Sequence, residues 1–237
     1  ADFEMCLATI KEKLGVKSAA VQFPIGKESG FTGEVDLVRM VGWLYTQNKD
    51  DPPKEIAIPE ELKGKADFYH AQLLETLAEY DDEIMEDVLE GKEPSVEKIK
   101  SVIRKATLTA KFFPVFCGTA FKDKGIQLLL DGVIDYLPSP LEIPGEKGEL
   151  NGKPYVCKVT DDAPFVGLAF KIATDPFIGR LAYVRVYQGE LKSGTYVLNS
   201  SRGNQERIAR LVLMHANHRQ EVSVLHAGEI GAVVGLK

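Results

Sequence analysis

The sequence has few cysteines and lacks the short motifs that mark several common catalytic chemistries. Its three cysteines, Cys6, Cys117 and Cys157, lie far apart and show neither CxxC nor Cys/His spacing. This scarcity argues against a disulfide framework and favours reduced thiols in a cytoplasmic protein. No GxxxxGK[ST] loop, GxSxG elbow or HExxH pair occurs in the 237 residues. The stretch therefore lacks the motifs of a phosphate-binding loop, an α/β-hydrolase nucleophile and a zinc protease.

Long apolar runs are missing as well. None approaches the roughly 18 residues of a membrane span, and the first residues lack the layout of a signal peptide. We therefore expect no membrane partner and no targeting segment. Of the four histidines, His215 and His218 have a spacing that would suit a metal pair on a helix. Because their segment looks like a strand end and a loop, we expect no metal site.

The charges divide unevenly along the chain. Residues 1–110 hold 14 Lys and Arg against 22 Asp and Glu, whereas residues 151–237 hold 11 against 7. The two parts therefore differ by sign, −8 against +4, within an overall net charge of −6. Such an asymmetry suggests different partners for the front and the rear of the chain.

Hydrophobic periodicity predicts helices in the front part and short strands in the rear part. Helical spacing of apolar residues is seen at 2–14, 60–80, 82–90, 95–110 and 124–136. Strands are expected at 18–23, where Pro24 would end the strand, and at 31–41, whereas 45–59 reads as loop or edge strand. After Pro154, short strands alternate with turns at 155–160, 166–174, 180–190, 195–199, 206–214, 221–225 and 230–234. This pattern predicts an antiparallel barrel behind an α/β region.

One stretch, FFPVFCGTAFKDKG at 112–125, has the pattern of a strand, a tight turn and the start of a helix. Ligands of open α/β sheets bind in such loops, at the carboxyl ends of the strands. Most loops of this kind are nevertheless ordinary connections without a ligand. The residues alone leave both interpretations open for Gly118, Thr119 and Ala120.

Two surfaces are candidates for charged partners. Acidic residues gather between 75 and 90, where they form either a solvated helical face or a docking surface for a basic protein. Basic residues lie beside turns of the rear part, among them Arg180, Lys192 and Arg202. Barrel loops often contact nucleic acid, although no regular aromatic ladder for base stacking is visible here.

Five stretches, in matching order and spacing, together resemble bacterial-type translation elongation factor G. They are CGTAFKDKGIQLLLDGVIDYLPSP (117–140), FTGEVDLV (31–38), TDPFIGRLAYVRVYQGELKSGTYVLN (174–199), MHANHRQEV (214–222) and HAGEIGAVVGLK (226–237). The resemblance runs over essentially the whole chain. It implies a GTPase that couples GTP hydrolysis to the movement of tRNA and mRNA through the ribosome.

The resemblance also implies a domain plan. Residues 1–25 would belong to the GTPase core, 26–110 to a G′-type insertion, and 111–140 to the last strand and helix of that core. Residues 141–154 would be a linker, and 155–237 would be the β-barrel domain II, stopping before its final strand. An open barrel edge of this kind predicts self-association. The family's phosphate loop, switches, DxxG and NKxD elements are absent, so the chain would start just after NKxD.

Site residues follow from the same resemblance. Gly118, Thr119 and Ala120 match the family's fifth nucleotide motif, usually GSA, whose backbone N–H groups approach the guanine base. Since the phosphate and Mg²⁺ groups are missing from these residues, we expect GTP and Mg²⁺ in the intact protein and no catalytic residue or cofactor here.

Partners follow from it too: the ribosomal stalk protein at the insertion and small-subunit rRNA at the barrel. The residues expected to dock the stalk protein are Glu75, Glu79, Asp82, Glu83 and Glu86. The residues expected to face the rRNA are Arg180, Lys192 and Arg202.

Two other interpretations remain. A sister translational GTPase, such as a release-factor, recycling or ribosome-protection type, shares the barrel, although the insertion at 26–110 favours elongation factor G. Alternatively, these residues by themselves form a non-catalytic module that interacts with the ribosome.

Overall fold

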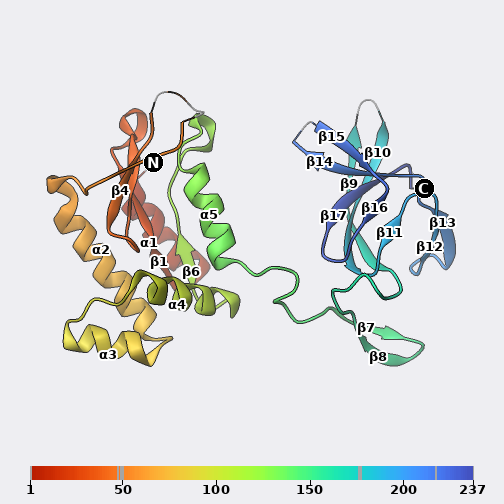
Figure 1. The fold of residues 1–237 in the computed structure, drawn as a ribbon, viewed down its shortest axis with the longest axis horizontal. Coiled ribbons are helices and arrows are strands. Elements are labelled where there is room, and N and C mark those ends of the chain that lie inside the picture. The colour runs from red at the N-terminus through yellow and green to blue at the C-terminus, as the bar shows by residue number, and fades with distance from the viewer. Residues whose placement is uncertain (1, 47, 49–50, 176–177, 217, 237) are drawn as a thin grey trace. The chain divides into compact units, whose positions relative to one another are not determined.

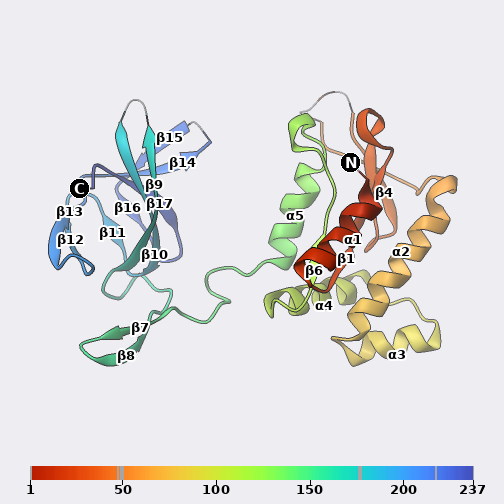
Figure 2. The ribbon, with the colours of Figure 1, turned by 180° about the vertical axis from the view of Figure 1, so that it is seen from behind.

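A computed structural model describes residues 2–46, 48, 51–175, 178–216 and 218–236. Pro176, Phe177, Asn217 and Lys237, which belong to the stretches that carry the resemblance, lie outside the described residues. The chain divides into two compact units, Ala1–Pro138 and Ser139–Lys237, and each is considered by itself (Figures 1 and 2).

The first unit combines helices with two small sheets. Its helices are α1 Phe3–Leu14, α2 Glu60–Ala78, α3 Asp82–Glu90, α4 Val96–Leu108 and α5 Ile126–Tyr136, with 3-10 turns at Glu28–Gly30 and Ala120–Lys122. Its strands are β1 Ser18–Ala20, β2 Gln22–Ile25, β3 Gly33–Asp36, β4 Val41–Leu44, β5 Lys54–Ile56 and β6 Phe113–Val115. Strands β1 and β6 pair in parallel, and β2, β3, β4 and β5 form an antiparallel sheet in that order.

The helices begin and end where the capping residues predict. The Asp2 carboxylate accepts the amide of Met5 at the start of α1, and Gly15 ends that helix in the left-handed conformation. At α4 the Ser95 hydroxyl accepts the amide of Lys98, which confirms the predicted serine cap. These local contacts satisfy backbone groups that have no partner within the helix.

Two strand predictions in the first unit were wrong. The strand expected at 31–41 is a hairpin, because the Asp36 carboxylate accepts the amides of Val38 and Arg39 and turns the chain between β3 and β4. Pro24 does not end its strand but lies inside β2. It is tolerated there because β2 is the edge of its sheet and needs no second row of hydrogen bonds.

The core of the first unit lies beneath its three middle helices. Fully buried Leu73 and Leu77 of α2 and Ile99 and Ile103 of α4 belong to one cluster with Phe23 of β2. Helix α4 contacts α2, α5 and β6, and so links helix α2 to the strand that precedes the turn at 118–120.

The second unit is built of strands. They are β7 Lys147–Leu150, β8 Lys153–Val156, β9 Val166–Asp175, β10 Gly179–Gln188, β11 Leu191–Lys192, β12 Tyr196–Asn199, β13 Asn204–Arg207, β14 Arg210–His215, β15 His218–Val222, β16 Val224–Leu225 and β17 Ile230–Val234. A five-stranded sheet has the order β15-β14-β17-β10-β9, and three two-stranded pairs join β11 to β16, β12 to β13 and β7 to β8. All of these pairings are antiparallel.

The strand boundaries of the second unit differ from the sequence expectation in several places. The strand expected at 155–160 ends at Val156 as β8, and β11 was not expected. The segment 141–154, expected as a linker, contains β7 and the start of β8. Asn151 and Gly152 both have positive φ and form the two-residue turn of this hairpin. The strands expected at 206–214 and 221–225 each divide in two, as β13 with β14 and β15 with β16. The predicted fold class, an α/β region followed by an antiparallel β region, is confirmed.

No helix among the described residues combines the length and the apolar character that crossing a membrane requires.

Candidate functional site

The turn at 118–120 connects the end of β6 to helix α5. Thr119 and Lys124 form an isolated bridge in which the Thr119 N–H donates to the Lys124 carbonyl over 2.8 Å, and the Lys124 N–H donates back over 3.2 Å. The 3-10 turn Ala120–Lys122 closes the loop between them, and Gly125, with a φ of 84°, begins α5. The turn is thus a closed loop held by its own backbone.

These hydrogen bonds reduce the number of backbone amides in the turn that could donate to a ligand. The Thr119 N–H, one of the three groups expected to approach a base, is already used within the loop. Within the described part of the chain, no hydrogen bond is recorded from the amides of Gly118 or Ala120. Gly118 and Ala120 are therefore the two donors that the turn can offer.

Gly118 is required by the loop itself. A Cβ at this position would lie 2.9 Å from the Lys124 carbonyl oxygen and 3.2 Å from Gly125 Cα, both of them backbone atoms. The sequence interpretation placed the close approach between this glycine and a ligand. In the structure the close approach is between two backbone segments of the same loop, so Gly118 has a structural role whether or not a ligand binds.

Residues between 31 and 45 lie near the loop that contains the turn. The Lys124 ammonium donates to the Phe31 carbonyl over 3.0 Å. Nearby, the Tyr45 hydroxyl donates to Glu34 Oε1 over 2.6 Å, and Glu34 is fully buried. The Lys124 ammonium therefore links the loop to Phe31, which lies far away in the sequence.

Burial determines the protonation state of the Glu34 carboxyl. It raises the pKa of the Glu34 carboxyl to about 7, against the opposing effect of the Tyr45 hydrogen bond. The second carboxyl oxygen, Oε2, is buried and has no hydrogen-bond partner among the described residues. Burial also raises the pKa of the Cys117 thiol, and the charge of Glu34 adds to that shift. Near neutral pH the Glu34 carboxyl therefore populates both its charged and its neutral form.

A cavity of about 700 Å³ lies beside the turn. It is lined by α1, by the loop that follows β2, and by the chain from Val115 to Thr119. Its volume is within the range of small-molecule pockets. Of the three predicted residues, Gly118 and Thr119 line this cavity, whereas Ala120 is not among its lining residues.

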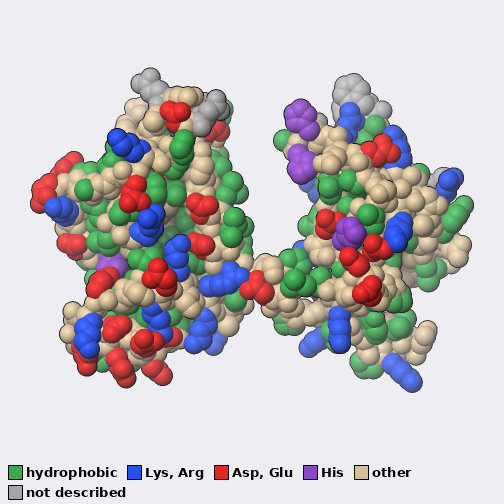
Figure 3. All heavy atoms as spheres, in the orientation of Figure 1, with side chains coloured by type: hydrophobic (Ala, Val, Ile, Leu, Met, Phe, Trp, Pro, Cys, Tyr) green, Lys and Arg blue, Asp and Glu red, His purple; other side chains and the backbone are tan. Residues whose placement is uncertain are grey.

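The predicted acidic residues lie on α2 and α3, where acidic side chains gather at the lower end of the unit in Figure 3. Glu79 is paired with Lys17 and Glu83 with Lys98. Glu75, Asp82 and Glu86 are exposed, and no ion pair is recorded for them in the described part of the chain. We call these three residues the acidic face.

Apolar side chains accompany the acidic face. On α3, Leu89 is 81% exposed and Met85 is 43% exposed, while Ile84 on the opposite side of the helix is fully buried. The outer side of α3 therefore offers carboxylates and apolar groups together. The sequence predicted the charges, whereas the exposure of Leu89 becomes visible only in the structure.

The predicted basic residues are exposed but come from different sheets. Arg180 begins β10 of the five-stranded sheet, Lys192 ends β11, and Arg202 lies in the turn between β12 and β13. Lys192 is already paired with Glu190 over 2.5 Å. No contact among the three is recorded for the described residues, so the structure does not assemble them into one cluster.

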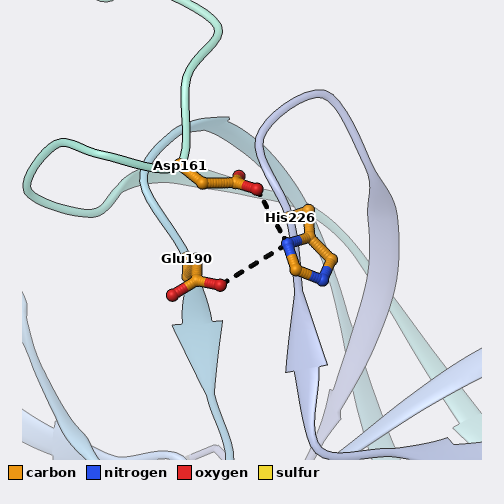
Figure 4. Close-up of side chains that lie close together, drawn as sticks. All are labelled: Asp161, Glu190 and His226. Carbon is orange, nitrogen blue, oxygen red and sulfur yellow. Dashed lines mark hydrogen bonds and ion pairs between the residues drawn. The ribbon is translucent and has the colours of Figure 1, made fainter.

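The structure also brings together three side chains that sequence spacing did not predict, Asp161, Glu190 and His226 (Figure 4). They belong to three loops of the second unit and lie far apart in the sequence. No short motif could have revealed them, because their proximity depends on the pairing of β11 with β16.

Comparisons with known proteins show which family the chain is similar to. Residues 164–237 match the family model of elongation factor G domain 2. Over its full length the chain is 48% identical to elongation factor G of Mycoplasma pneumoniae, and it covers 35% of that protein. The chain is homologous to elongation factor G. The family recognised from the sequence is thereby confirmed.

A solved structure has a similar fold. A crystal structure of a protein from Thermus thermophilus matches 99% of the chain with a TM-score of 0.73 and 25% identity, and the match covers 32% of that protein. The chain thus spans about a third of the length of the relatives it matches. Similarity to elongation factor G includes both units, and with them the turn at 118–120 and the acidic face.

Proposed function

We propose that this chain is the part of a translocation GTPase that joins the nucleotide site to surfaces contacting the ribosome. The observation that carries the proposal is the 48% identity to elongation factor G along the entire chain. The intact protein would couple GTP hydrolysis to tRNA and mRNA movement in the cytoplasm, using GTP and Mg²⁺. The matches name elongation factor G, and nothing in them favours a sister translational GTPase.

Within this function we assign the domain plan expected from the family. Residues 1–25 and 111–140 belong to the GTPase core, and residues 26–110, with strands β3–β5 and helices α2–α4, are the inserted subdomain. Support comes from the parallel pairing of β1 with β6, since parallel strands are typical of sheets covered by helices on both faces. The antiparallel strands after residue 155 form the second domain.

The turn at 118–120 contributes a guanine contact. The amides of Gly118 and Ala120 are the donors, since that of Thr119 is engaged with Lys124. Backbone donors held in a closed loop need no rearrangement to meet a carbonyl oxygen of the base. Residues 1–137 include no phosphate loop and no Mg²⁺ ligands of the family, so the turn alone does not hold a nucleotide.

The acidic face docks the ribosomal stalk protein. Glu75, Asp82 and Glu86 have no ion pair among the described residues. Two of them, Asp82 and Glu86, share α3 with exposed Met85 and Leu89, and such a surface suits a partner that is basic and partly apolar. Complementary charge of this kind mainly raises the association rate.

The barrel faces small-subunit rRNA through Arg180, Lys192 and Arg202, each contributing a phosphate contact rather than a base contact. Strand β9, an edge strand with Leu168, Phe170 and Ile172 half or more exposed, supports self-association when nothing covers it.

A segment exchange tests the proposed function. Residues 1–237 replace the matching segment of the Mycoplasma pneumoniae elongation factor G, and GTP hydrolysis is measured with and without ribosomes. We expect the chimaera to keep hydrolysis that ribosomes stimulate, because the segment would supply a guanine contact and the ribosome-facing surfaces. A folded chimaera that binds GTP but gains nothing from ribosomes would contradict the proposal.

The same chimaera tests the acidic face. Changing Glu75, Asp82 and Glu86 to lysine should slow ribosome-stimulated hydrolysis about tenfold at low salt, and less at high salt where charges are screened. The matched control changes Glu60 and Glu61, which are exposed in the first turn of α2, to lysine. Equal effects of the two variants would show a general charge effect and would remove the docking assignment.

A further inference from the structure

Asp161, Glu190 and His226 converge on one point of the second unit (Figure 4). Asp161 lies in the loop between β8 and β9, Glu190 between β10 and β11, and His226 between β16 and β17. One donor atom from each residue lies within 4.8 Å of the other two. His226 Nδ1 is the common point, 2.9 Å from Asp161 Oδ2 and 3.5 Å from Glu190 Oε1.

In each of the two carboxylates, the oxygen that does not face His226 has a partner outside the group of three. Asp161 Oδ1 accepts the backbone N–H of Ala227 over 2.9 Å, and Glu190 Oε2 is paired with the Lys192 ammonium. The backbone of His226 is fixed too, because its N–H donates to Glu229 Oε2 over 2.7 Å. The three donor atoms are thus directed at one another by partners outside the group, the arrangement that orients ligands in metal sites.

The distances suit a divalent metal ion. Zinc binds imidazole nitrogen and carboxylate oxygen at about 2.0–2.2 Å, so neighbouring ligand atoms of a tetrahedral site lie about 3.3 Å apart. The observed 2.9 and 3.5 Å lie on either side of that value. Small rotations of the side chains are enough to place an ion between the three atoms.

The chemistry of the donors agrees with the geometry. The Ala227 amide, and after it His226, hold the pKa of Asp161 below its usual range, so this carboxyl is charged at neutral pH. Metal binding needs a neutral imidazole that carries its proton on Nε2, and it replaces the hydrogen bond between Nδ1 and Asp161. Two carboxylates and one neutral imidazole together carry a charge of −2, which would balance the charge of a divalent ion.

We propose that Asp161, Glu190 and His226 form a surface site for a divalent transition-metal ion such as Zn²⁺, with water completing the coordination. The site is distinct from the nucleotide turn, which lies in the other unit. Bound metal would join three loops of the second unit and would hold Glu190 beside Lys192, one of the basic residues assigned to face rRNA.

A titration of the 237-residue chain with ZnCl₂, followed by NMR of the histidine ring nitrogens, tests the site. A reducing agent that does not chelate metals keeps the thiols reduced. We expect the ring signals of His226 to shift in a saturable way, whereas those of His70 remain unchanged. Asp161→Asn and Glu190→Gln, which preserve side-chain shape, should each weaken binding about tenfold or more.

The matched control is Asp162→Asn, which removes the same charge from the neighbouring exposed residue outside the group. This variant should bind Zn²⁺ as tightly as the parent chain. Unshifted His226 signals, or equal weakening by Asp162→Asn and Asp161→Asn, would overturn the proposal. In either case the three side chains form a hydrogen-bonded clamp between loops and no metal site.

Discussion

The two units of the chain bury their apolar side chains in different places. In the first unit the core lies beneath α2, α3 and α4, whereas α5, which follows the turn at 118–120, keeps Leu130 and Ile134 more than half exposed. In the second unit a core cluster lies where β10, β14 and β17 meet, and the edge strand β9 keeps Leu168, Phe170 and Ile172 half or more exposed.

This difference shows which parts of each unit have a complete hydrophobic core. One buried cluster of the first unit joins helices α2 and α4 to strands β1 and β2 and to Tyr136 of α5, whereas the second unit has clusters of its own. The part that carries the turn at 118–120 has only two parallel strands and a half-covered helix, an arrangement that parallel sheets rarely adopt without further layers. The turn nevertheless has a defined shape, because its own backbone hydrogen bonds close the loop and the Lys124 ammonium donates to the Phe31 carbonyl.

The largest expected effect comes from breaking one core at a time. Leu73→Ala removes a fully buried side chain of α2 and should lower the free energy of unfolding of the first unit by about 2–5 kcal/mol. The second unit should be unaffected, because the two units have separate cores. Hydrogen exchange resolved by residue reads the two units separately.

The reciprocal variant is Leu211→Ala, at a fully buried position of β14. It should lower the stability of the second unit alone by a similar amount. Loss of protection in both units after either substitution would mean that they unfold together, and the comparison between them would fail.

A smaller effect on stability is expected from the buried Glu34 carboxyl. The pKa of Glu34 is about 7 in the folded chain against an ordinary 4.5, so the folded state favours the neutral carboxyl. The stability that this provides is fully present below pH 4.5 and is lost as the pH rises through about 7, a change of up to about 3 kcal/mol.

Glu34→Gln should remove this pH dependence and keep the Tyr45 hydrogen bond, because the amide oxygen still accepts. Urea unfolding of both proteins between pH 4.5 and 8 measures the difference. Curves that remain parallel across this range would show that Glu34 does not titrate near neutral pH.

Local chemistry made much of the fold predictable. Asp2 and Ser95 cap helices as the sequence indicates, and five helices lie close to their predicted ranges. Two hairpins were missed although their signals are short and local. Asp36 turns the chain through its carboxylate, and the Asn151-Gly152 pair is a strong hairpin signal inside a segment that composition marked as a linker.

The site was less predictable because its groups depend on distant partners. The sequence identified Gly118, Thr119 and Ala120, but the loss of the Thr119 amide to Lys124 is a property of the folded loop. Likewise, the buried Glu34–Tyr45 pair, the pairing of Glu79 and Glu83 with lysines and the Asp161, Glu190 and His226 group all require tertiary proximity.

The central claim is that the turn at 118–120 contributes a guanine contact but holds no nucleotide without the phosphate-binding groups of the family. A titration of the polypeptide 1–237 with a fluorescent GDP analogue and Mg²⁺ tests it most directly. We expect no saturable binding at micromolar concentrations, because two backbone amides cannot replace the contacts to the phosphates and the metal. Saturable micromolar binding that unlabelled GDP displaces would contradict the claim.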